Sequence, residues 1–168
     1  MATFHSVIAP DHHHLAAIGR IVVLWTFVEH SIESLVWELA NLKQPYAQSV
    51  TTHLQTLALI DMSKTLLNQH FAGTDLEERS KTLLNRIANQ LRVKRNMVVH
   101  GIWSPTGTPE KISIMQTTAR GILNFKVGEE MTSNDILDIA AEIDECLFQL
   151  TKLSFEVSNA LQTKLSSP

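Results

Sequence analysis

The chain of 168 residues contains a single cysteine, Cys146, so it cannot form an internal disulfide, and this fits a reducing cytoplasm. Its start, MATFHSVIAPDHHHL, lacks the basic region and the apolar run of a signal peptide. Its longest strongly apolar run, Ile21 to Trp25, is far too short to span a bilayer. We therefore expect a cytoplasmic protein with no membrane partner.

Several signatures of enzyme classes are also missing. The sequence has no Glu-x-x-His pair for a two-metal bundle, no GxxxxGK or GxGxxG phosphate loop, no Cys-x-x-Cys and no Gly-x-Ser-x-Gly. The adjacent histidines at 12–14 could bind a metal adventitiously, but neighbours point in different directions on a helix and no acid or thiol at metal-ligand spacing accompanies them. We expect no metal site and no cofactor.

What is present is typical of one globular domain spanning residues 1–168. Apolar residues make up 44% of the chain and charged residues 18%, and this length is enough to bury a full core. The net charge of -3 argues against bulk binding of nucleic acid, although it does not exclude a local basic patch.

Charge is segregated along the chain. Basic residues cluster between positions 79 and 95 with no acid after Glu78, and acidic residues cluster between 129 and 145. Two interpretations stay open: two solvated helix faces that attract each other, or a basic footprint for RNA. In the second interpretation three of the basic residues contact phosphates, namely Arg86, Arg92 and Lys94.

The segment from Asn85 to Trp103 carries the most specific pattern. Its apolar stripe at three- and four-residue spacing predicts a helix and consists of Leu84, Ile87, Leu91 and Val98. Arg95 lies on that stripe, four residues after Leu91, where a core helix needs an apolar residue. Arg95 is therefore a candidate functional residue.

Two further polar residues come after Arg95. Asn96 and His100 lie nearly above one another on a helix, and Arg95 would have to bend across to share their site. Gly101 predicts a left-handed end to the helix, where the helix dipole favours a protonated His100. A fixed cation, an amide and an imidazole suit a phosphodiester substrate.

The first predicted helix also contains a misplaced polar residue. Its seam of bundle spacing consists of Ile18, Val22, Trp25, Glu29, Ile32, Val36 and Leu39. Glu29 is the acid in this seam, and a buried carboxylate is costly unless it is paired or protonated. Either the helix is rotated so that Glu29 reaches solvent, or Glu29 faces Arg95 and holds it in place.

The remaining periodicities predict an all-α fold, an antiparallel four-helix bundle with a small β-hairpin inserted between the third and fourth helices. Capping boxes at Thr74 with Glu77, and at Thr132 with Asp135, mark two helix starts. The predicted ranges are a leader at 1–13, helices at 15–42, 45–71, 75–100 and 133–162, and a hairpin at 112–127.

The arrangement Arg95-Asn96-x-x-x-His100, late in the third helix of a helical chain, resembles the Arg-polar-x-x-x-His signature of the HEPN superfamily (higher eukaryotes and prokaryotes nucleotide-binding domains). The resemblance implies a metal-independent endoribonuclease with His100 as general acid/base, Arg95 stabilising the transition state, Asn96 orienting and Glu29 supporting. It also implies a homodimer that pairs two motifs around one cleft. The biological setting stays open between a toxin, a defence effector and a sensor, and a separate antitoxin-like protein is a candidate partner.

Two other hypotheses remain. The chain could be a non-catalytic module of the same fold that binds RNA or a nucleotide, or regulates a partner. Alternatively, Glu29 and Arg95 form a buried pair that fixes helix register, and His100 merely ends its helix.

Overall fold

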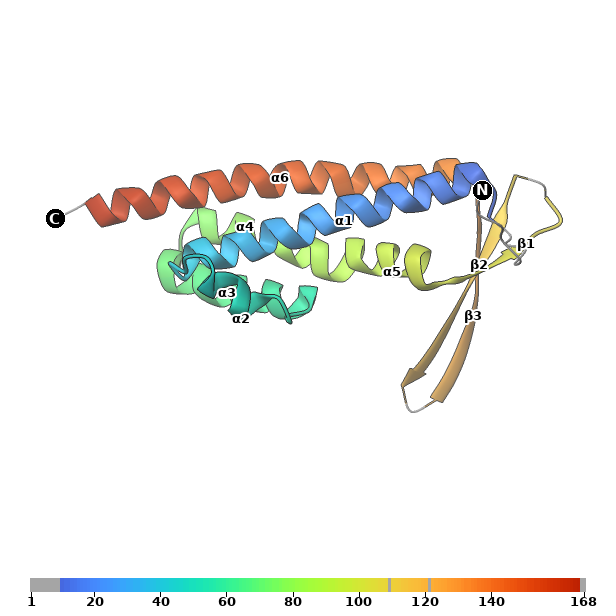
Figure 1. Cartoon of the computed structure of the whole chain (residues 1–168), viewed down its shortest axis with the longest axis horizontal. Coiled ribbons are helices and arrows are strands. Elements are labelled where there is room, and N and C mark those ends of the chain that lie inside the picture. Colours follow the sequence, from blue (N-terminus) through green and yellow to red (C-terminus); the bar gives the residue numbers. More distant parts are fainter. Residues whose placement is uncertain (1–9, 109, 121, 167–168) are drawn as a thin grey trace.

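The computed structural model describes residues 10–108, 110–120 and 122–166 (Figure 1). Helices dominate it, as predicted, and a small sheet lies at one end. In chain order the elements are α1 (His12–Leu39), α2 (Tyr46–Thr51), α3 (Thr56–Phe71), α4 (Asp75–Arg86), the π-helical turn η1 (Ile87–Leu91), α5 (Arg92–His100), β1 (Ile102–Pro105), β2 (Ile112–Arg120), β3 (Ile122–Met131) and α6 (Ser133–Ser166).

The two longest helices, α1 and α6, lie side by side and run in the same direction (Figure 1). Against one side of this pair pack α3 and the continuous helix made of α4, η1 and α5. The antiparallel four-helix bundle is therefore not confirmed. Its helical class is observed, but the first and last helices are parallel because α4, η1 and α5 run back to the end at which α1 begins, and α6 starts from the sheet at that same end.

The start and end of α1 differ from the predicted range of 15–42. The helix begins at His12 because the Asp11 carboxylate accepts hydrogen bonds from the backbone N–H groups of His13 and His14, each at 2.9 Å. The predicted leader thus includes a helix start, while residues 1–9 lie outside the described part of the chain. The helix ends at Leu39, and Asn41 then adopts a positive φ of 51°.

The predicted helix at 45–71 is two helices, because the chain breaks between Thr51 and Thr56. The Thr51 hydroxyl is buried, donates to the Glu33 carboxylate and accepts from the indole N–H of Trp37 at 2.9 Å. These bonds fix the end of α2 against α1, and α3 starts afresh at Thr56. Residues 52–55 therefore form a corner instead of a continuous helix.

The predicted helix at 75–100 is continuous but contains one wide turn, η1. Within it the backbone N–H of Arg92 bonds to the carbonyl of Ile87, five residues earlier instead of four. A π-turn of this kind accommodates one extra residue. The residues after it therefore face a different direction from the one that an ordinary helix of the same sequence would give them. All four predicted stripe residues are nevertheless buried, namely Leu84, Ile87, Leu91 and Val98.

The sheet contains three antiparallel strands in the order β1-β2-β3, one more than predicted. The composition after His100 predicts loop, but β1 pairs there with β2, with Trp103 opposite Ile114. Gly101 is extended (φ -72°, ψ 154°), so the predicted left-handed cap is wrong. Glycine is needed for space: a Cβ there would lie 2.2 Å from Ile114 Cγ2.

The β2–β3 hairpin extends past its predicted range, to Met131, and its far half projects beyond the helices (Figure 1). Near its base the pairing shifts between Ser113 and Met115, and a Cβ on Gly128 would lie 1.3 Å from the Ile114 carbonyl oxygen. Leu123, Phe125 and Val127 alternate with polar residues in the sequence, which predicts that one face of the hairpin packs on the helices. These side chains lie outside the described part of the structure.

One core joins the helices to the base of the sheet. Its largest fully buried side chains are Trp25, Ile21, Ile32, Leu35, Ile60, Leu67, Leu84, Ile87, Leu91, Ile114, Ile136 and Ile143. By length and composition alone, α1 is apolar enough to cross a membrane. Core helices of water-soluble proteins meet the same criterion, and nine residues of α1 are buried inside this fold.

Candidate functional site

A cavity of about 270 Å³ opens where three helices meet. Its walls come from the middle of α1, the N-terminal end of α3 and the whole of α5. The lining residues are Trp25, Glu29, Gln55, Thr56, Leu57, Arg92, Arg95, Asn96 and His100. The cavity therefore brings together all three predicted catalytic residues, the predicted supporting acid and one of the predicted phosphate-binding residues.

The side chains of α5 contact one another directly. Arg95 Nη1 donates to Asn96 Oδ1 at 3.0 Å and lies 2.8 Å from Nε2 of His100. His100 is exposed at the end of the helix, one turn beyond Asn96. Arg95 thus bends across the helix surface to share a site with the other two, in the geometry expected from their spacing.

The contact between Arg95 and His100 determines which imidazole nitrogen carries a proton. A guanidinium group can only donate hydrogen bonds. His100 Nε2 must therefore accept, so it is unprotonated in this arrangement and the ring proton is on Nδ1. The contact with Arg95 thus selects the tautomer with the proton on Nδ1, whereas the helix-end position favours a doubly protonated ring.

Arg95 is tolerated on an apolar stripe because its head group turns into the cavity. Its Cζ lies 5.9 Å from the centroid of the Trp25 ring, whose side chain is 2% exposed, so the cation packs against an aromatic face. Its Nε is buried and has no hydrogen-bond partner among the described residues. An unsatisfied buried donor is costly, and an anion in the cavity would satisfy it.

Glu29 is partly buried and lines the same cavity, so both interpretations of this residue capture part of its position. Val28 points into the core in its place, which means that the helix is rotated relative to the predicted seam. Glu29 Oε1 accepts a hydrogen bond from the Thr56 hydroxyl, at the start of α3. No ion pair joins Glu29 to Arg95 in the described structure. The supporting role of Glu29 stays a prediction.

Three of the basic residues in the predicted footprint separate in space. Arg92 lines the cavity, and its Nε donates to the carbonyl of Ala88 at 3.1 Å. Lys94 points toward α6, where its Nζ bonds both carboxylate oxygens of Glu142 at 2.6 and 2.7 Å. Arg86 faces a different groove. The solvated-face interpretation therefore describes Lys94, and the phosphate interpretation is compatible with Arg92.

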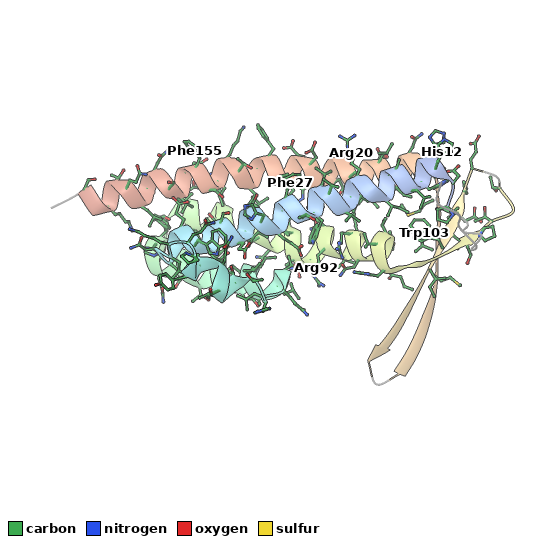
Figure 2. All side chains as sticks on the ribbon, in the orientation of Figure 1. His12, Arg20, Phe27, Arg92, Trp103 and Phe155 are labelled. Carbon is green, nitrogen blue, oxygen red and sulfur yellow. The ribbon has the colours of Figure 1, made fainter. Side chains whose placement is uncertain are left out.

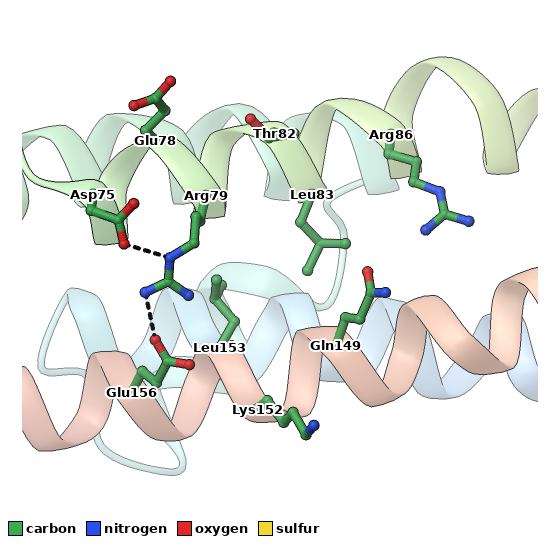
Figure 3. A pocket seen from close by; sticks show the side chains of 10 residues that line it. All are labelled: Asp75, Glu78, Arg79, Thr82, Leu83, Arg86, Gln149, Lys152, Leu153 and Glu156. Carbon is green, nitrogen blue, oxygen red and sulfur yellow. Dashed lines mark hydrogen bonds and ion pairs between the residues drawn. The ribbon is translucent and has the colours of Figure 1, made fainter.

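A larger groove of about 680 Å³ runs between α4 and α6, and no sequence pattern pointed to it (Figure 3). Arg79 is held there by Asp75 at 2.7 Å and by Glu156 at 2.8 Å, and the Glu156 carboxylate in particular raises the pKa of Arg79 above its usual range. Arg86 lies further along the groove (Figure 3). Arg79 is neutralised by these partners, and the described lining includes no histidine or cysteine, so acid–base chemistry favours the smaller cavity.

No set of three or more histidine, cysteine or acidic side chains in the described ranges is placed to hold a metal ion. The single thiol lies in the core, where burial raises the pKa of Cys146 to about 11. It therefore stays protonated near neutral pH and lines neither of the two cavities.

The residues that sequence reasoning missed all belong to the start of α3. Gln55, Thr56 and Leu57 line the cavity because the chain turns a corner before Thr56. The helical periodicity of residues 45–71 does not reveal this corner, so it does not predict which side chains face α5. Trp25, expected as a core residue, also forms part of the cavity wall.

Comparisons of the chain with protein-family models, with curated proteins and with solved structures find no match in any of the three. Any function assigned to this cavity must therefore be derived from its own residues.

Proposed function

We propose that the chain is an endoribonuclease that cleaves RNA without a metal ion, and that the cavity between α1, α3 and α5 is its site. The observation that supports this most strongly is the meeting of Arg95, Asn96 and His100, with Arg95 Nη1 at 3.0 Å from Asn96 Oδ1 and 2.8 Å from His100 Nε2. The resemblance of this motif to the HEPN signature points to the same activity.

RNA carries its own nucleophile, the 2′-hydroxyl next to each phosphodiester. Cleavage needs a base for that hydroxyl, a cation for the charge that develops on phosphorus-bound oxygens, and an acid for the leaving 5′-oxygen. Arg95 and Arg92 supply positive charge in the cavity, and His100 and Glu29 are groups that exchange protons. Every requirement is thus met by side chains of this chain.

The test is cleavage of single-stranded RNA by the purified chain in the presence of EDTA. We expect cleavage by the wild type and a loss of about 10²- to 10⁴-fold in His100→Ala, because proton transfer by a positioned side chain contributes that much. The matched control is His53→Ala, since His53 is an exposed histidine that does not line the cavity. Undiminished cleavage by His100→Ala would reject the nuclease proposal.

The second candidate is a module that binds RNA or a nucleotide without cleaving it. It is favoured by one contact: the acid–base nitrogen of His100 is already occupied by Arg95 in the free protein. A wild-type chain that binds RNA and leaves it intact under all conditions would establish this candidate in place of the first.

We also propose a homodimer, supported by exposed apolar side chains on the outer surfaces of the two long helices. They include Val23 and Phe27 on α1, and Phe148 and Phe155 on α6, with Phe155 71% exposed. Large exposed apolar groups of this kind are typical of association surfaces. In Figure 2, Phe155 lies on α6 and Arg92 lies in the layer of helices that packs against α1 and α6, so a dimer formed through the outer side of α6 leaves each cavity open.

A further inference from the structure

Two proton-exchanging side chains reach the cavity from different helices. Glu29 comes from the middle of α1, and His100 comes from the end of α5. Only one oxygen of Glu29, Oε1, is engaged, by the Thr56 hydroxyl; Oε2 has no hydrogen bond or ion pair in the described structure. A carboxylate held by one oxygen and open at the other is suited to take a proton from a ligand.

Arg95 is poised to change partner when an anion enters. Its Nη1 now donates to His100 Nε2, and its buried Nε donates to nothing in the described structure. A phosphodiester offers two charged oxygens to these donors, and a charge-assisted bond to phosphate is stronger than one to a neutral imidazole. Transfer of Arg95 to the phosphate releases Nε2 of His100 beside a negative charge, which favours the protonated ring.

We propose that Glu29 is the general base and His100 the general acid of RNA cleavage in this cavity, with Arg95 exchanging His100 for the scissile phosphate. The inference rests on the proposed endoribonuclease activity and assigns opposite proton-transfer roles to these two residues. Glu29 thereby becomes a catalytic residue in contact with the ribose, instead of a support for Arg95.

The reaction conserves atoms and charge. The Glu29 carboxylate takes the proton of the 2′-hydroxyl while the 2′-oxygen forms a bond to phosphorus. The bond from phosphorus to the 5′-oxygen breaks, and the His100 imidazolium gives its proton to that oxygen. The products are a 2′,3′-cyclic phosphate and a free 5′-hydroxyl, and proton exchange with solvent restores the two side chains. No oxidant, reductant or additional reactant is required.

The opposite assignment is chemically weaker. Glutamate side chains are ordinarily ionised near neutral pH, so a glutamate carboxyl would seldom hold a proton to donate. Histidine exchanges protons in that range, and the bound phosphate favours its charged form. The acid therefore belongs at His100.

The two roles can be separated with an RNA in which sulfur replaces the scissile 5′-oxygen. A thiolate leaves without needing a proton, so this substrate bypasses the general acid but still needs the base. We expect Glu29→Gln to lose about 10²- to 10⁴-fold on both substrates, since base catalysis contributes that much. We expect His100→Asn to lose a similar factor on normal RNA and to recover most of it on the sulfur substrate.

The chain provides a matched control one turn further along α1. Glu33 accepts a hydrogen bond from Thr51 much as Glu29 does from Thr56, but it does not line the cavity. Glu33→Gln should cleave both substrates at the wild-type rate. Glu29→Gln should also bind a non-cleavable 2′-deoxy analogue as tightly as the wild type and lose the acid-side fall of the pH–rate profile, which a purely structural role would leave in place.

Each result decides between the proposals. A wild-type chain that cleaves neither substrate overturns the endoribonuclease activity and this inference with it. Cleavage by the wild type together with full activity of Glu29→Gln overturns the base assignment while the nuclease proposal stands. Equal losses for His100→Asn on both substrates, or recovery of Glu29→Gln by the sulfur substrate, overturn the assignment of acid and base.

Discussion

Arg95 Nη1 lies 2.8 Å from His100 Nε2, five residues along the same helix, and this contact holds the histidine in one tautomer. Both side chains line a cavity that also contains Arg92 and Glu29. In the free protein the acid–base nitrogen of His100 is therefore in contact with the Arg95 cation. Arg92 and Glu29 are the other charged side chains that line this cavity.

This contact predicts an imidazole signal that NMR can detect. In ¹⁵N–¹H correlation spectra of the free protein, we expect His100 to be neutral with its proton on Nδ1, because Arg95 only donates. Arg95→Met, which keeps much of the apolar stem against Trp25, should abolish that preference. The exposed His53 serves as the reference signal. A protonated Nε2 on His100 in the wild type at neutral pH would contradict the contact.

The separation of the basic residues predicts unequal effects on RNA binding. Arg92→Ala should weaken binding of a 2′-deoxy oligonucleotide and reduce the slope of log affinity against log salt by about one, since one phosphate contact is lost. Lys94→Ala should change the slope little, because Lys94 is paired with Glu142. Fluorescence anisotropy over a range of salt concentrations measures both. Equal changes for the two variants would place the phosphate site elsewhere.

Glu77 predicts how stability changes in acid. Hydrogen bonds from the Lys81 ammonium, then from Asn68 and from the Gly73 backbone N–H, lower the pKa of Glu77 from 4.5 to about 2. A lowered folded-state pKa means that this stabilisation is complete above pH 4.5 and is lost as the pH falls from about 4.5 to about 2.

Urea unfolding of Glu77→Gln between about pH 6 and pH 2 tests this dependence. At about pH 6 the variant should have a smaller free energy of unfolding than the wild type. This difference should shrink as the pH falls from about 4.5 to about 2. Glu78→Gln is the control, because Glu78 lies on the same turn but is exposed. A difference that stays constant throughout would mean that the Glu77 carboxylate contributes no pH-dependent stability.

The exposed aromatic residues of α6 predict an association that does not depend on the cavity. We expect light scattering to show a dimer, and Phe155→Asp to convert it to a monomer because a charge is then placed in an apolar interface. The monomer should retain cleavage, since one chain supplies every residue of the cavity. A monomer with no activity would instead support a cleft shared between two chains.

The sequence predicted several residues that line the cavity better than it predicted the fold around them. Arg95 and Glu29 attract attention for the same physical reason: each interrupts an apolar stripe, and a polar group in such a position needs a compensating environment. The environment is the cavity that both line. The absence of an ion pair between Glu29 and Arg95 in the described structure was not predictable. The Thr56 hydroxyl donates a hydrogen bond to the Glu29 carboxylate instead, and Thr56 follows a corner that helical periodicity does not reveal.

The arrangement of elements was harder to predict for similar reasons. β1 comes directly after a helix, and the prolines and glycines around it are typical of loop. Its pairing places Trp103 opposite Ile114, across the loop between β1 and β2, and local sequence patterns do not reveal this contact. The Trp103 indole N–H also donates to the Val98 carbonyl at 3.1 Å, and so provides a hydrogen-bond partner for a carbonyl in the last turn of α5. α1 and α6 are parallel because the continuous helix of α4, η1 and α5 already ends beside the start of α1, and α6 begins from the sheet at that same end.

The wide turn η1 sets where the motif can act. Leu84 and Leu91 lie on either side of its centre, both in the core, while Arg95 beyond it reaches the cavity. If the same residues wound as an ordinary helix, everything after this turn would be rotated by roughly 100° about the axis, and the Arg-Asn-x-x-x-His motif would face away from Glu29. A relative that lacks one residue here could form ordinary helix and still direct an intact motif toward Glu29. The winding of this one turn, together with the six residues of the motif, thus determines whether they face the cavity.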